Sequence, residues 1–163
     1  MSNNLELFNT LHCDYHPMVL QMCLGFMKGD LDLAKDLAQV VFINTWQGLD
    51  KFKNASSYKT WIYRITVNTC LKYIRDKKDK HQVPLEDEHA YLAEETTHSP
   101  GLQHQILYQA IGQLGEVDRL IMMMVLDELE YLEISNIIGI SEGNLRVKIH
   151  RIKKNLKKIL EHE

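Results

Sequence analysis

The chain has 163 residues, of which 45% are apolar and 25% charged, and its formal net charge is −3. The length suits one ordinary domain or two small ones, and the apolar fraction excludes an intrinsically disordered chain. Its 3 cysteines, Cys13, Cys23 and Cys70, show no paired spacing, which argues against a disulfide framework. The start is polar and acidic rather than basic and apolar, and no apolar run has membrane-spanning length. Together these features favour a reducing, cytoplasmic compartment.

The small net charge conceals a segregation of charge along the chain. Eleven Lys or Arg stand against eight acids before residue 81, whereas residues 81–108 contain five acids and no Lys or Arg. Residues 146–158 contain seven basic residues and no acid. Because the local potential decides where a phosphate backbone lies, nucleic acid is a candidate partner despite the negative total.

Apolar residues recur three and four positions apart, and alternating β-branched runs closed by Asn-Gly or Asp-Gly turns are absent. This pattern predicts an all-α chain without strands. The shift in composition divides it into two small helical domains, residues 1–80 and 102–163, joined by an acidic, flexible linker at residues 81–101.

In the first domain, the periodicity predicts helices over about residues 5–27 and 30–49, with Asp30 as the N-cap of the second. A short polar loop follows at residues 51–57. Ser56 or Ser57 is then expected to cap a third helix, which ends in the basic run 75–80.

That third helix carries an unusual stripe, because Trp61, Arg64, Asn68, Lys72 and Arg75 lie three and four residues apart. Cations can meet phosphates, rings can stack on bases and an amide can read a base edge, so the stripe suits a nucleic-acid strand. The polar loop before it can hold an unstacked base. The alternative is that Trp61 belongs to the core and only the charged members face solvent.

The second domain contains a helix-turn-helix pattern. Residues 131–138 have helical apolar spacing, Gly139 interrupts it, and Ser141 is a suitable cap for a further helix. On that last helix, Leu145, Ile149 and other apolar residues fall within one arc, and the basic residues fall outside it. This arrangement favours DNA in contact with the outer face, although a basic amphipathic helix can also merely solvate its charge.

Longer stretches carry a resemblance to a known family. The segments DLAQVVFINTW at 36–46, LDKF at 49–52 and SSYKTWIYRI at 56–65, with Asn68, resemble the second conserved region of sigma-70 factors. Residues 114–126 and the segment EISNIIGISEGNLRVKIHR at 133–151 resemble the fourth region. The order and spacing of the two regions look like the extracytoplasmic function (ECF) group of bacterial transcription initiation factors. The expected fold is therefore a region 2 helical bundle linked to a region 4 helix-turn-helix.

The resemblance implies roles for individual residues. The chain is expected to bind core RNA polymerase, at the clamp helices of the largest subunit and at the flap, and to direct initiation at promoter DNA. The residues implied at the clamp helices are Asp36, Gln39, Val40 and Asn44. Those implied at the melted minus-ten element are Lys53, Asn54, Ser56, Ser57, Tyr58, Lys59, Trp61, Arg64, Asn68 and Lys72. Those implied at the double-stranded minus-thirty-five element are Ser141, Asn144, Arg146, Lys148 and Arg151.

Other classes of function are less well supported. His12 and His16 lie one turn apart and can share a metal, but Cys13 and Cys23 are badly spaced to join them, so we expect no metal site and no cofactor. Phosphate-loop, nucleophile and Rossmann motifs are absent, so we expect no enzyme. A regulator that binds an operator without polymerase, and a protein–protein adaptor, stay open as alternatives. Many family members are held by an anti-sigma factor, and the residues do not show whether this chain has one.

Overall fold

The computed structural model describes residues 2–80 and 102–162, and these residues form helices and turns only. The all-α prediction is confirmed. The predicted linker, 81–101, lies outside the described residues. The elements in chain order are α1 (Ser2–Phe26), α2 (Leu31–Gly48), the short 3-10 helix η1 (Leu49–Lys51), α3 (Tyr58–Lys80), α4 (Leu102–Gly112), α5 (Glu116–Leu126), α6 (Tyr131–Ile138) and α7 (Glu142–Glu161).

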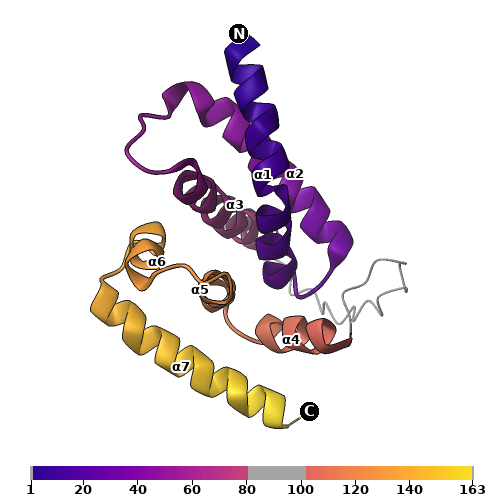
Figure 1. The fold of residues 1–163 in the computed structure, drawn as a ribbon. Coiled ribbons are helices and arrows are strands. Elements are labelled where there is room, and N and C mark those ends of the chain that lie inside the picture. The colour runs from indigo at the N-terminus through magenta and orange to yellow at the C-terminus, as the bar shows by residue number, and fades with distance from the viewer. Residues whose placement is uncertain (1, 81–101, 163) are drawn as a thin grey trace.

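Helices α1, α2 and α3 pack against one another and form the first lobe (Figure 1). The turn between α1 and α2 contains Lys28 and Gly29, both with positive φ. Asp30 then caps α2, because its carboxylate accepts a hydrogen bond from the backbone N–H of Leu33 at 3.1 Å. The core between the helices includes the fully buried Val41 and Tyr63. The predicted Asp30 cap is therefore confirmed.

Helices α4 to α7 form the second lobe, in which α7 packs across α4, α5 and α6. Gly139 ends α6 in the left-handed conformation, with φ of 86°. Ser141 then begins α7 by accepting a hydrogen bond from the backbone N–H of Asn144 at 3.2 Å. The glycine turn and the serine cap lie where the sequence predicted a helix-turn-helix.

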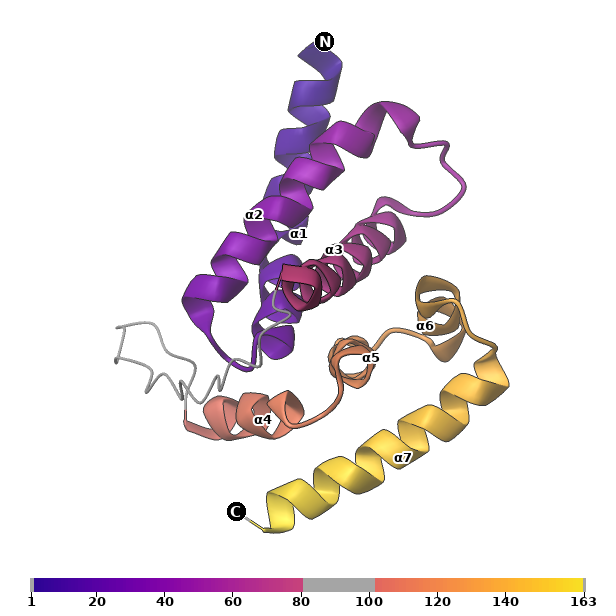
Figure 2. The same cartoon turned by 180° about the vertical axis from the view of Figure 1, so that it is seen from behind.

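The two lobes are in direct contact. Helix α5 packs against α1 and α3, α6 packs against α3, and α4 packs against the end of α1. Both views show α4, α5 and α6 lying between the first lobe and α7, so α7 faces away from α1–α3 (Figures 1 and 2). No described helix is long and apolar enough to cross a bilayer.

Candidate nucleic-acid interface

Helix α7 presents a buried apolar face and an exposed basic face. Leu145, Ile149, Ile152 and Leu156 are buried against the rest of the second lobe. The basic side chains occupy the other sides, as the sequence predicted, and Val147 stands among them with 52% of its surface exposed. Exposed basic residues on the outer face are Arg146, Arg151, Lys153, Lys154, Lys157 and Lys158. The charge of this helix is therefore available to an external polyanion.

The predicted minus-thirty-five residues differ in how firmly the chain holds them. The Arg146 guanidinium pairs with Glu142 at 2.7 Å and lies 5.3 Å from the ring centroid of Tyr131. Lys148 pairs with Asp118 of α5 at 2.9 Å. Asn144 and Arg151 are exposed, and within the described parts of the chain no salt bridge or side-chain hydrogen bond engages Arg151. Arg146 is thus preoriented, whereas Arg151 projects freely.

The aromatic residues at the start of α3 form one cluster. The ring centroid of Phe52 lies 4.6 Å from that of Tyr58 and 4.8 Å from that of Trp61. The indole also packs over Gly48, where an added Cβ would lie 3.3 Å from the ring. Trp61 and Tyr58 are both half-buried. The Trp61 side chain is therefore partly packed against its neighbours and partly exposed, so one surface of the aromatic cluster faces solvent.

The loop before α3 is anchored by Ser57. Its hydroxyl oxygen accepts from the backbone N–H of Thr60 at 3.1 Å, which decides between the two caps that the sequence allowed. Asn54 has a positive φ of 55°, a conformation that asparagine tolerates better than most residues. Lys53, Asn54 and Lys59 are exposed, and Ser56 is half-buried. The predicted polar loop therefore has a defined shape beside the aromatic cluster.

A shallow hollow of about 220 Å³ lies between α2 and α3, lined by Asn44, Ile65, Asn68, Thr69 and Lys72. The Thr69 hydroxyl donates to the Ile65 carbonyl at 2.6 Å, so its oxygen can only accept from Asn44, whose amide nitrogen lies 3.0 Å away. This chain of hydrogen bonds turns the Asn44 carbonyl away from Thr69. The hollow therefore presents two amides, the Lys72 cation and the apolar Ile65 side chain beside the stripe on α3.

The outer face of α2 is apolar as well as polar. Asp36, Gln39 and Val40 are exposed there, as expected for a docking surface. The same face exposes Leu33, Ile43 and Trp46, with 55% of Ile43 and 44% of Trp46 accessible. The sequence analysis did not single out Ile43 and Trp46 as surface residues, although their helical spacing from Asp36 and Gln39 was visible. Asn44 lies apart from this face, on the side that meets α3.

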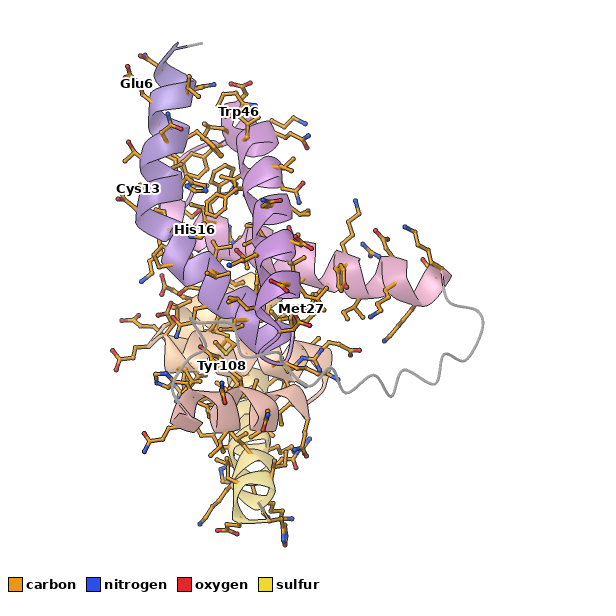
Figure 3. All side chains as sticks on the ribbon, turned by 90° about the vertical axis from the view of Figure 1, so that its right-hand side faces the viewer. Glu6, Cys13, His16, Met27, Trp46 and Tyr108 are labelled. Carbon is orange, nitrogen blue, oxygen red and sulfur yellow. The ribbon has the colours of Figure 1, made fainter. Side chains whose placement is uncertain are left out.

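Histidines and aromatic rings meet between α1 and α2. The ring centroid of His12 lies 5.0 Å from that of His16 and 4.5 Å from that of Phe42. Burial lowers the pKa of His16, and the neighbouring His12 lowers it further. Cys13 is exposed on another side of α1 from His16 (Figure 3). Cys23 is buried. Among the described residues no three His, Cys, Asp or Glu side chains gather as a metal site would require.

Two family models match the chain: "Sigma-70 region 2" over residues 11–80 and "Sigma-70, region 4" over residues 104–156. The ECF RNA polymerase sigma factor SigW of Bacillus subtilis (strain 168) is 28% identical over 159 residues, which are 90% of this chain and 84% of the relative. The ECF RNA polymerase sigma-E factor of Escherichia coli (strain K12) is 30% identical over 162 residues, 90% of this chain and 82% of the relative.

Solved structures share the fold. The sigma factor RpoE from Bartonella quintana, in complex with the anti-sigma factor NepR, aligns with a TM-score of 0.75 at 20% identity, covering 94% of this chain and 96% of that one. CnrH in complex with the cytosolic domain of CnrY aligns with a TM-score of 0.72 at 18% identity, covering 99% of this chain and 92% of that one.

Proposed function

Because this chain belongs to the sigma-70 family, in its ECF group, we propose that it binds core RNA polymerase and directs initiation by reading two promoter elements with its two lobes. The family consists of transcription factors rather than catalysts, and the function needs no catalytic residue. One observation carries the proposal: a single chain combines an exposed cationic helix α7 with an exposed apolar and polar face on α2. Such a factor acts with polymerase, in the cytoplasm.

We assign the minus-thirty-five element to α7. A recognition helix contacts base edges with its N-terminal residues, where Asn144, Arg146 and Lys148 lie, and Arg151 follows further along the same helix, where we propose that it contacts a phosphate of the same element. An arginine held in a fixed orientation, as Arg146 is by Glu142 and Tyr131, can read guanine in a bidentate manner. Arg146→Lys should keep the charge but lose base discrimination of about 1–3 kcal/mol, measured on single-base promoter variants.

We assign the melted minus-ten strand to the start of α3 and the loop before it. The half-exposed rings of Tyr58 and Trp61 offer a surface on which bases can stack. Lys53 and Lys59 are near these rings in the sequence and can contact the phosphates of the same strand. The hollow that includes Asn44 and Asn68 continues this surface. We therefore propose that Asn44 contacts promoter DNA, whereas the family resemblance implied a contact with polymerase. Asn44→Ala should reduce promoter opening, monitored by permanganate footprinting, and leave core affinity unchanged.

We propose that the clamp helices of the polymerase bind to the outer face of α2. Docking energy usually concentrates in a few aromatic and other large side chains, which makes Trp46 and Ile43 the expected anchors beside Asp36 and Gln39. Changing Asp36 and Gln39 together to alanine should weaken core binding in a pull-down. Lys35→Ala, an exposed change on the same helix, is the matched control. Undiminished binding of the double variant would show that the assignment is wrong.

An anti-sigma factor is a further proposed partner, because the sigma factor RpoE from Bartonella quintana, which shares this fold, was solved in complex with the anti-sigma factor NepR. The decisive test of the main proposal is in vitro transcription with purified core enzyme on a library of genomic fragments. We expect specific transcripts only when both core and this chain are present. An operator-binding regulator would instead bind its DNA site tightly without core polymerase, and that result would refute the proposal.

A further inference from the structure

Val147 is an apolar residue on the outer, cationic side of α7. Because successive residues of a helix are rotated by about 100°, Val147 lies opposite the buried Leu145 and Ile149. Its surface is 52% exposed, and it takes no part in the apolar core of the described residues. One turn earlier, Gly143 carries no side chain, and a Cβ there would meet nothing within 4 Å. In both views α7 is the outermost helix of the second lobe, so Val147 is accessible to an external ligand (Figures 1 and 2).

Folding alone does not explain a valine at this position. Single exposed apolar residues are common on protein surfaces, so the position of Val147 is more informative than its exposure. A β-branched side chain is a poorer helix former than the lysines and arginines that occupy the rest of this face, and an exposed position offers no packing in return. The valine is explained if its methyl groups contact an apolar group of the ligand that α7 binds.

The charged residues on either side of Val147 are held away from it. Arg146 is held toward α6, where its guanidinium lies 5.3 Å from the ring centroid of Tyr131. Lys148 is held toward α5 by its pair with Asp118 at 2.9 Å. Restricted rotation about χ1 also fixes the direction of a β-branched side chain in a helix. The methyl groups of Val147 are therefore presented between two restrained cations, with little conformational entropy left to lose on binding.

Thymine is the base whose major-groove edge matches such a side chain. It carries a C5 methyl group, whereas the edges of guanine, adenine and cytosine are read through hydrogen-bond donors and acceptors. Valine can neither donate nor accept, so against those edges it would exclude water without supplying a partner. Burying one methyl group is worth about a fourfold gain in affinity.

We infer that Val147 determines specificity within the minus-thirty-five element by contacting the C5 methyl group of a thymine. This inference rests on the proposed function, and Val147 is not among the residues that the family resemblance implied. Asn144 and Arg151 lie three residues before and four residues after Val147, so the three share one side of the helix. The thymine therefore lies in the stretch of groove between the base edge proposed for Asn144 and the phosphate proposed for Arg151.

Selection from a randomised promoter locates the thymine. A promoter recovered from the genomic library is randomised across its upstream element, and holoenzymes made with the wild type, Val147→Ser or Val147→Ile select from the pool. Serine has nearly the helix propensity of valine, and isoleucine keeps the apolar branched side chain. We expect one position at which the wild type and Val147→Ile enrich thymine. At that position alone, Val147→Ser should lose about fourfold of the enrichment. Leu160→Ser, which changes an exposed apolar residue at the far end of α7, should select as the wild type does.

Replacing that thymine by deoxyuridine removes the methyl group and leaves the base pair intact. Fluorescence anisotropy should show that the wild-type holoenzyme binds the deoxyuridine promoter about fourfold more weakly, and that Val147→Ser binds both promoters equally. Circular dichroism establishes that each variant is folded, and Val147→Ala, which favours the helix more, repeats the test if the serine variant is not.

The outcomes separate the inference from the proposed function. If upstream selectivity exists but no thymine preference depends on Val147, or if deoxyuridine affects the wild type and Val147→Ser alike, the inference is overturned and the proposed function stands. If none of the proteins binds core polymerase, or none selects an upstream sequence, the proposed function fails and the inference fails with it.

Discussion

Replacing Arg151 by alanine should remove one DNA contact without disturbing the helix that carries it. The side chain is exposed, and no salt bridge or side-chain hydrogen bond within the described ranges engages it. An exposed change of this kind usually alters the free energy of unfolding by less than about 0.5 kcal/mol. A change in promoter affinity would therefore report on the contact with DNA and not on folding.

The expected magnitude follows from counterion release. Each phosphate contact adds about 0.9 to the slope of log affinity against log salt concentration. When the salt concentration is raised fourfold, from about 50 to about 200 mM, the promoter affinity of the wild type should therefore fall by a factor about 3.5 times larger than that of the variant. The affinities of the two proteins should converge by that factor as salt increases.

Fluorescence anisotropy of the holoenzyme on a labelled duplex carrying the minus-thirty-five element provides the measurement. Lys158→Ala is the control, because it removes the same charge from the last turn of α7, far from the residues expected in the groove. If Arg151→Ala kept the wild-type slope while Lys158→Ala lowered it, α7 would bind DNA with its C-terminal half. The proposed orientation of the helix would then be refuted.

Three further predictions concern the fold. Ser141→Ala should lower the free energy of unfolding by about 1 kcal/mol in urea titrations, because the α7 cap is lost, and an unchanged midpoint would contradict the cap. The pKa of Glu116 lies below its ordinary value of 4.5, owing first to its own backbone N–H and then to Lys78. Its contribution to stability should therefore be complete above pH 4.5 and be lost as the pH falls through the lower folded-state pKa; Glu116→Gln should flatten that part of a urea-unfolding profile. The hydrogen bond with Cys23, together with burial, raises the pKa of Cys70, so mass spectrometry should find Cys70 unmodified by iodoacetamide until the chain unfolds, and rapid native labelling would contradict its burial.

Local features were predictable because they depend on neighbours in the sequence. The caps at Asp30 and Ser141, the glycine turn at Gly139 and the apolar arc of α7 all follow from spacing within one or two turns. The family motifs likewise named most residues of the proposed interfaces. Each of these local features depends on an interaction between residues only a few positions apart in the sequence.

Other features were decided only by tertiary contacts between distant segments. Asn44 faces α3 because Thr69, 25 residues away, accepts its hydrogen bond. Arg119 is buried because Phe26 of the other lobe covers it, although an arginine beside a polar helix start would be expected at the surface. Periodicity assigns a residue to a face of its helix, but it does not state which other helix meets that face. The amino-acid order therefore determined the helices and their chemistry, and the packing of α5 against α1 and α3 determined which of those helix faces are buried between the lobes.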